Sequence, residues 1–340
     1  MPAHSATPTG TAALPQGRRI VAVIALAPAL VALALWAFAW PAARTAPRDL
    51  PLGVAGPATA TAPLQKQLSR HQGAFEIHHY ADEAAARDAI EDRTVYGAIV
   101  ATAQGPELLT ASAASPLVAQ LLQQAVTRHV PKGTKVTTTD VVPASAKDPR
   151  GAALGASVLP LTLVGIAAGA VVTLLGLRGT RAVAALEGTA ALVGVVAAVL
   201  AHSWLGVFTG NWWAEAAALG LSTLAVSAAV AGLAALIGPP GIGLGAFVVM
   251  LLGNPASGAS SAPQMLPEPV GTIGQWLPPG AGASLLRSVS FFDGAAATGP
   301  ALTLTWWAVL GLGAVLLGNA LKRGRTTTQA VAGLEPALAS

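Results

Sequence analysis

The sequence predicts an α-helical polytopic membrane protein of about six spans, the fifth broken or re-entrant, with an extracytoplasmic α/β domain inserted between spans 1 and 2. Hydrophobic residues make up 53% of the 340-residue chain and charged residues only 10%, whereas soluble proteins carry about 25% charged residues. The apolar residues gather in long uncharged runs. The polar residues gather too, since 11 of the 19 Lys and Arg residues and 10 of the 15 acidic residues lie between positions 41 and 150. A polar domain therefore interrupts an apolar chain.

The first apolar run predicts an uncleaved membrane anchor over residues 18–40. Arg18 and Arg19 precede 21 uncharged residues, which suffice to cross a hydrocarbon core of about 30 Å. A cleavable signal peptide is the alternative, but its apolar region has about 7–15 residues, so the length favours an anchor. Residues 1–17 are small and polar without periodicity, which is typical of a disordered tail, here on the cytoplasmic side.

Residues 41–150 alternate between strand-like and helix-like patterns, which predicts a small α/β sandwich outside the cytoplasm. Asp82 is suited to cap the start of one helix, and Ser115 followed by Pro116 marks the start of another. The predicted strands are 50–56, 74–80, 95–102, 106–112 and 134–142, and the predicted helices are 61–71, 82–93 and 115–130.

Residues 151–321 form the predicted five-span membrane domain. Its apolar runs are 154–177, 182–201, 214–237, 242–253 and 301–321. Arg178 and Arg181 lie between the first two of these runs, and Lys322 opens a basic cluster after the last one. Because Lys and Arg in short loops stay on the cytoplasmic side, both termini are expected in the cytoplasm, including the tail 322–340.

The fifth apolar run is too short for an ordinary crossing. It has about 13 residues, and a stretch rich in Pro and Gly follows it. Irregular backbone persists at membrane depth only where protein or a watery cavity surrounds it. We therefore expect a helix that unwinds near Asn254-Pro255 and an outer re-entrant segment over 254–299. An ordinary crossing with a loose outer loop is the alternative.

The sequence offers no pattern for catalysis, cofactor binding or metal binding. Cysteine is absent, which excludes disulfides and Cys-ligated zinc, and no phosphate-binding loop or nucleophile elbow occurs. The adjacent His78 and His79 would point to opposite faces of a strand and could not chelate one metal together. The basic residues form no run with interleaved aromatics, so a nucleic-acid partner is not expected.

Three features together resemble a known family. They are the segments 80–100 and 111–125, the stretch LPPGAGASLLRSVSFFDG within 252–294, and the layout of one span, a long outer domain and five closely spaced spans. Over about residues 15–325 the chain resembles the type-2 ABC transporter permeases, in particular the branch that includes phage-infection-protein-like membrane proteins.

The resemblance implies a non-enzymatic permease subunit that forms a homodimer or pairs with a second permease. A separate cytoplasmic ATPase would drive it to move a lipid, drug or polymer outward through the membrane lipid. In such permeases the segment between the second and third spans contacts the ATPase, which here corresponds to Arg178, Arg181 and Glu187. This loop is very short, and no long amphipathic helix precedes the first span, so the chain departs from the family pattern at the coupling region.

The segment 242–290 is expected to shape the outer mouth of the pathway. The residues predicted to line this vestibule are Asn254, Pro255, Trp276, Arg287 and Asp293. Arg287 and Asp293 flank the last span and could form a solvated ion pair. Glu215 is expected as a structural charge near a helix amino terminus, and His202 as an interfacial residue.

The sequence is also compatible with two other functions. A non-transporting cell-envelope receptor or scaffold would act through its extracytoplasmic domain. A secondary, ion-driven transporter ranks third, because the sequence indicates no relay of buried acids and bases within the spans. The bias toward Ala, Gly and Arg with little Lys suggests a bacterial source, and hence the bacterial plasma membrane.

Overall fold

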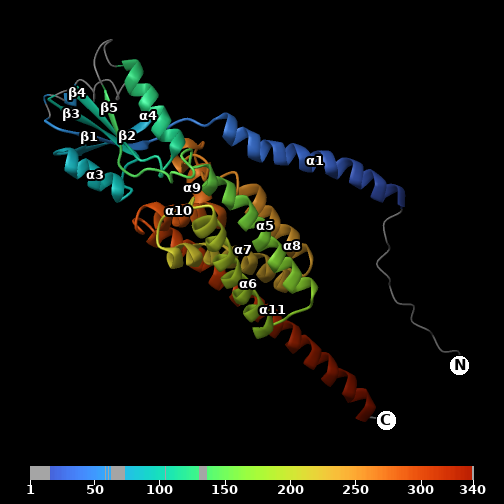
Figure 1. Ribbon diagram of the computed structural model, residues 1–340. Coiled ribbons are helices and arrows are strands. Elements are labelled where there is room, and N and C mark those ends of the chain that lie inside the picture. The colour runs from blue at the N-terminus through green and yellow to red at the C-terminus, as the bar shows by residue number, and fades with distance from the viewer. Residues whose placement is uncertain are drawn as a thin grey trace.

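In the computed structural model, a small sheet domain lies at one end of a bundle of long helices (Figure 1). The structure describes residues 16–57, 59, 61–62, 73–103, 105–129 and 136–338. Among these residues, five helical segments are long and apolar enough to cross a membrane. They belong to α1 (Gln16–Ala43), α5 (Ala152–Leu174), α6 (Thr180–Ala198) with its π-helical extension η1 (Val199–Trp204), α7 (Trp212–Ile237) and α11 (Thr298–Leu338). The chain is therefore a mostly helical, polytopic membrane protein.

The sheet domain contains one five-stranded mixed sheet. Its strands are β1 (Leu50–Ala55), β2 (Phe75–Tyr80), β3 (Gly97–Thr102), β4 (Gly105–Thr110) and β5 (Thr137–Asp140). They are ordered β2-β1-β3-β4-β5, and only β3 and β4 form an antiparallel pair. All five strands lie within the predicted segments or within one residue of them.

Within the described residues of the domain, two helices cover the sheet. Helix α3 (Glu83–Glu91) packs against the core that contains Ala98 and Val100, whereas α4 (Pro116–His129) packs against the core that contains Ile99. Because side chains alternate along a strand, these two cores lie on opposite faces. Asp82 caps α3, and the Ser115 hydroxyl accepts a hydrogen bond from the N–H of Val118, as predicted. The predicted helix 61–71 falls almost wholly outside the described residues.

Helix α7 occupies the centre of the bundle, where α5, α6, α8, α10 and α11 contact it. In the apolar stretch of α7, 61% of the residues are buried, against 11–28% in the corresponding stretches of the other four spans. Small residues allow this enclosure. A Cβ added at Gly194 of α6 would overlap the carbonyl oxygen of Ala216, and one added at Gly311 of α11 would overlap the backbone of Ala228. Close backbone contact of this kind is typical of packing between membrane helices.

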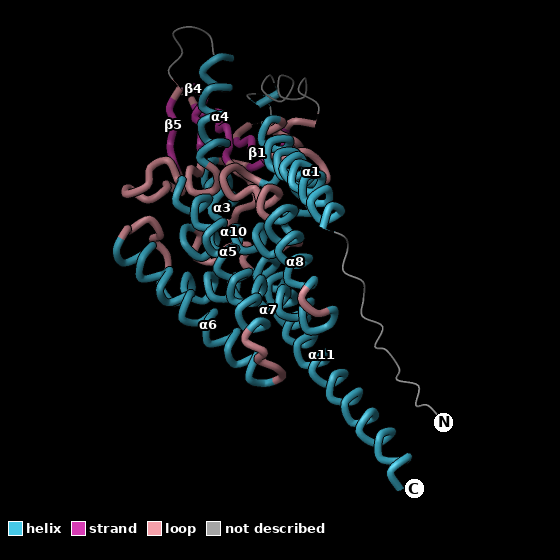
Figure 2. Tube along the Cα trace, turned by 90° about the vertical axis from the view of Figure 1, so that its right-hand side faces the viewer, coloured by secondary structure: helices cyan, strands magenta, loops and turns pink. Residues whose placement is uncertain are grey.

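The fifth apolar run is interrupted, as predicted. Helix α8 (Pro240–Ala246) continues into the π-helix η2 (Phe247–Gly253), and together they form a 14-residue helix. At 1.5 Å per residue this helix is about 21 Å long, shorter than a hydrocarbon core of about 30 Å. Irregular chain follows, and then the short helices η3 (Pro263–Met265), α9 (Val270–Gln275) and α10 (Pro278–Phe291). In Figure 2, α10 lies between the sheet domain and the long helices.

Candidate functional site

A crevice of about 330 Å³ lies where α1, α5 and the irregular segment 254–266 meet, with one residue of α4 at its edge. The helices contribute mainly apolar side chains, and the irregular segment contributes mainly small and polar residues. The lining residues are Phe38, Ala42, Thr45, Leu117, Gly155, Val158, Leu159, Asn254, Pro255, Ser257, Gly258, Ala259, Ser260, Ser261 and Leu266. No charged side chain occurs among them. The crevice thus lies between the bundle, the first helix and the sheet domain.

Two polar side chains of the crevice have no partner in the described part of the chain. The amide of Asn254 and the hydroxyl of Ser260 make no hydrogen bond there, whereas the Ser257 hydroxyl donates to the Asn254 carbonyl oxygen at 2.7 Å. Gly155 of α5 allows the segment to come close, because a Cβ at this position would lie 3.2 Å from the Ser260 Cα atom. The crevice therefore offers unpaired hydrogen-bonding groups beside an apolar wall.

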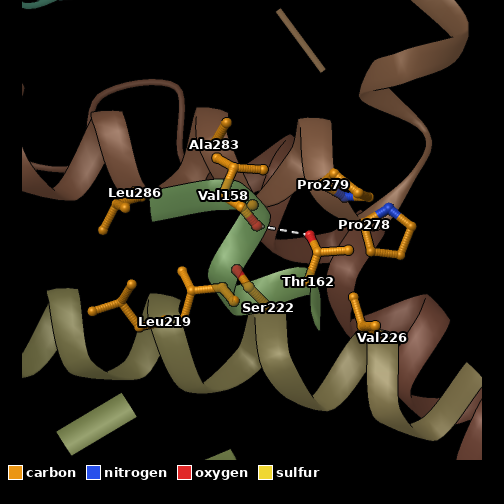
Figure 3. Close-up of a pocket in the computed structure, with 11 residues that line it drawn as sticks. Val158, Thr162, Leu219, Ser222, Val226, Pro278, Pro279, Ala283 and Leu286 are labelled. Carbon is orange, nitrogen blue, oxygen red and sulfur yellow. Dashed lines mark hydrogen bonds between the residues drawn. The ribbon is translucent and has the colours of Figure 1, made fainter. Parts of the chain in front are cut away.

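Val158 lines the crevice and also a second, smaller pocket, which Figure 3 shows. This inner pocket, of about 20 Å³, lies between α5, α7 and the start of α10, and its volume is enough for about one water molecule. The Thr162 hydroxyl donates to the carbonyl oxygen of Val158 at 2.8 Å, so it is satisfied within its own helix. A bulky ligand could therefore occupy the crevice but not the inner pocket.

Side chains from α9 and α10 hold the irregular wall of the crevice in place. The Gln275 side-chain amide donates to the Ser257 carbonyl oxygen at 3.0 Å, and the Ser284 hydroxyl donates to Oε1 of the Gln275 side chain at 2.6 Å. The guanidinium of Arg287 donates to the Ala259 carbonyl oxygen at 2.9 Å, and this arginine is only 4% exposed. The contacts to Ser257 and Ala259 satisfy backbone carbonyl groups that a regular helix would have paired internally.

The sheet domain is attached to the same network through Arg93 and Tyr96. The Arg93 guanidinium donates to the Ser284 carbonyl oxygen at 3.0 Å and to the Ser288 hydroxyl, and it lies 5.3 Å from the ring centre of Phe292. The Tyr96 hydroxyl donates to the side chain of Gln264 at 2.9 Å. A continuous chain of contacts therefore connects the sheet domain with the crevice wall.

Burial at this junction shifts the pKa values of both attaching residues. Desolvation lowers the pKa of Arg93, and the neighbouring Tyr96 phenol opposes this shift. Desolvation raises the pKa of Tyr96, and the nearby Arg287 and Arg93 guanidinium groups oppose that shift. At neutral pH the Tyr96 phenol in the junction is consequently neutral.

The structure brings three of the five predicted vestibule residues together. Asn254 and Pro255 line the crevice, and Arg287 lies behind its wall. Trp276 is 70% exposed, and its carbonyl oxygen accepts a hydrogen bond from the Trp307 indole. Asp293 is exposed and forms no ion pair with the buried Arg287, so the expected solvated pair does not form.

The predicted coupling residues lie at the other end of the bundle. The α5–α6 turn contacts α11 near the end of its span, since a Cβ at Gly179 would lie 2.9 Å from the Asn319 amide nitrogen. Arg178, Arg181 and Glu187 are all exposed. Neither arginine forms an ion pair with Glu187.

Sequence reasoning missed a buried acid–base pair. Glu215 in the first turn of α7 is fully buried, and its carboxylate lies 2.8 Å from Nδ1 of His202 on η1. The N–H of Gly210 donates to the other carboxylate oxygen at 2.9 Å. The contact joins one buried carboxylate to a partly exposed imidazole at the start of α7, which fits the expectation of Glu215 as a structural charge and of His202 as an interfacial residue, and it is a single pair and not a relay. No local pattern indicates the pair, because its members are 13 positions apart and meet only through the turn of the chain.

Comparison of the chain with models of protein families, with curated proteins and with solved structures gave no match in any of the three cases. Within the described ranges, no group of three or more His, Asp or Glu side chains could hold a metal ion. The crevice and the contacts around it are accordingly the features on which a functional argument can rest.

Proposed function

We propose that the protein is the membrane permease subunit of an exporter in the bacterial plasma membrane, driven by a separate cytoplasmic ATPase. The observation that carries this proposal is the uncharged crevice beside α1. Since α7 fills the centre of the bundle, a substrate would travel along the surface of the chain and not through its middle. A crevice open at the side of a membrane helix suits a substrate that arrives from the bilayer, such as a lipid or an apolar drug.

The proposed orientation places the sheet domain outside the cytoplasm, with both termini inside and the segment 254–299 re-entering the membrane from outside. The basic residues support it. Arg178 and Arg181 follow α5, and Lys322 and Arg323 end the span of α11, and both clusters lie at the end of the bundle opposite the sheet domain (Figure 2). Positive charges in short connections favour the cytoplasmic side.

Thiol labelling tests this orientation directly, because the chain has no cysteine of its own. Ala84→Cys places a thiol on the exposed side of α3, and Thr180→Cys places one at the α5–α6 turn. A membrane-impermeant maleimide should label Ala84→Cys in intact cells and Thr180→Cys only after the membrane is opened. The reverse pattern would contradict the orientation and the export direction that depends on it.

The coupling to an ATPase is tested with protein that is purified from the membranes of the cells that naturally produce it. When the chain is tagged and isolated in mild detergent, an ATPase should remain bound to it. After reconstitution in vesicles, the rate of ATP hydrolysis should be at least about fivefold lower in the variant that carries Arg178→Ala and Arg181→Ala. Two exposed ion pairs of about 0.5 kcal/mol each give this factor. Arg150→Ala, an exposed arginine of the sheet domain, is the matched control. Absence of any ATPase in the preparation, or equal hydrolysis in both variants, would refute the proposal.

A second candidate function is a non-transporting receptor or scaffold that acts through the sheet domain. Its supporting observation is the attachment of that domain to the bundle by Arg93 and Tyr96, which could transmit an event at the sheet to the membrane helices. Replacement of residues 50–145 by a short linker separates the two functions. Loss of an envelope phenotype with intact export would favour the receptor, whereas loss of export would favour the permease.

A further inference from the structure

We infer that the crevice beside α1 binds the uncharged, hydroxyl-bearing head of a diacyl lipid, of which diacylglycerol is the simplest example. The inference deepens the proposed function and rests on it in one respect, because it takes the bundle to be embedded in a bilayer. It goes further in naming the charge and the hydrogen-bonding character of the ligand.

The charges around the crevice argue against an anionic headgroup. In the described part of the chain none of the lining side chains is charged, and strong binding of an anionic phosphate by side chains uses arginine or lysine donors. The nearest arginines already have other contacts. Arg287 donates to the Ala259 carbonyl oxygen from behind the wall, Arg48 donates to the Met265 carbonyl oxygen at 3.0 Å, and Arg44 lies over the ring of Trp40 at 5.1 Å. A phosphate in the crevice would lose its hydration without gaining a counter-charge.

The polar groups of the crevice argue for a ligand that hydrogen-bonds. The Asn254 amide has two donors and one acceptor, and the Ser260 hydroxyl can donate and accept. Neither side chain has a partner within the described chain, although their neighbours Ser257 and Ser261 donate to backbone carbonyls. A hydroxyl with adjacent ester carbonyls could satisfy both groups at once. A purely apolar ligand would leave them unpaired, which is unfavourable.

The apolar wall and the volume indicate where the acyl chains lie. Phe38 and Leu159 are both more than one-third exposed and line the crevice on the side of the membrane helices α1 and α5. The crevice, of about 330 Å³, has room for on the order of ten water molecules, which fits a lipid head and the first carbons of its chains but not a whole lipid. The rest of each chain would remain in the bilayer along α1, whose span is only 11% buried.

Protection of a single thiol tests the inference. Thr45→Cys introduces a label site in the crevice and leaves Asn254 and Ser260 intact, since the Thr45 hydroxyl bonds only carbonyl oxygens at the end of α1. The purified protein is placed in phosphatidylcholine vesicles alone, with dioleoylglycerol, or with dioleoylphosphatidylglycerol. Dioleoylglycerol should slow maleimide labelling several-fold, whereas the anionic lipid should not. Ala84→Cys on the sheet domain should label equally in all three.

A matched pair of variants then assigns the contact. In the Thr45→Cys protein, Asn254→Leu with Ser260→Ala should raise the dioleoylglycerol content needed for half-protection about thirtyfold, the factor that corresponds to two net hydrogen bonds. Ser157→Ala is the control, because the Ser157 hydroxyl bonds the Ala153 carbonyl oxygen of its own helix at 2.7 Å and should not change protection. Equal labelling with and without dioleoylglycerol, or equal protection by both lipids, would overturn the inference.

This experiment is independent of the exporter proposal, because it uses neither ATP nor an ATPase. If no lipid protects the thiol while ATP hydrolysis still depends on Arg178 and Arg181, the permease stands and the neutral lipid is wrong. If dioleoylglycerol protects and no ATPase is found, the site stands and the exporter is wrong.

Discussion

Arg93→Met should loosen the attachment of the sheet domain to the bundle. The substitution removes two hydrogen bonds from a charged donor, each of which contributes about 1.5–3 kcal/mol, and a cation–π contact of about 1 kcal/mol with Phe292. It also leaves the fully buried Ser288 hydroxyl without this donor. The release of a guanidinium from a desolvated site offsets part of the loss, since burial lowers the pKa of Arg93. The net loss is about 2–3 kcal/mol.

Amide hydrogen exchange measures this loss locally. A decrease of about 2–3 kcal/mol in the free energy of opening should speed exchange of the α10 amides about 30- to 150-fold. Arg87→Met is the matched control, because its i,i+4 ion pair with Glu83 at 2.7 Å is about one-third exposed and contributes about 0.5 kcal/mol or less. Arg93→Lys should recover only part of the protection, since lysine lacks the planar fork of donors. Equal exchange in the Arg93→Met and Arg87→Met proteins would refute the reasoning.

Three further predictions concern other parts of the fold. In a Tyr80→Phe protein, which leaves Tyr96 as the only tyrosine, the phenolate absorbance should rise with a titration midpoint above pH 10, and unfolding in guanidinium should return that midpoint to about 10. Because the native pKa is raised, the stability contributed by the neutral phenol is complete below pH 10 and is lost as pH rises through the native pKa. An unshifted titration midpoint in the native protein would show that Tyr96 is not buried. Gly194→Ala should lower the thermal midpoint in detergent by several degrees because α6 must move away from α7. Gly188→Ala on the same helix meets open space and should raise the midpoint slightly, since Ala is the better helix former; equal midpoints in the two variants would contradict the close packing. His202→Leu should also lower the thermal midpoint, because it removes the imidazole partner of a buried carboxylate at a cost of about 1–3 kcal/mol. His202→Gln should recover part of this loss. An unchanged thermal midpoint in the His202→Leu protein would mean that the contact adds no stability.

Features encoded by neighbouring residues could be predicted from the sequence. The caps at Asp82 and Ser115 depend on residues three positions apart, and both helices begin where they indicate. The interruption after Gly253 follows from a short apolar run and the Pro- and Gly-rich stretch behind it, and the helix ends there. These signals are local, so tertiary packing did not alter them.

Features that depend on distant partners could not be predicted. Arg287 reads as an interfacial charge in the sequence, yet it is buried because the irregular chain 28 positions earlier presents the Ala259 carbonyl oxygen to it. Glu215 reads as a helix-start charge, yet Gly210 and His202 enclose it. The crevice has no sequence pattern at all, since it combines residues of α1, α5 and the segment 254–266. In each case the deciding contact is made between segments whose proximity only the fold defines.

The enclosure of α7 also bears on how the protein can be assembled during synthesis. Helices α5 and α6 leave the ribosome before α7, whereas α8, α10 and α11 follow it. Until α11 arrives, one side of α7 must face lipid with a surface of Ala, Gly and Ser that offers little area for contact. A chain that terminates before Thr298 would therefore leave this side of α7 without the helix that covers it in the complete fold.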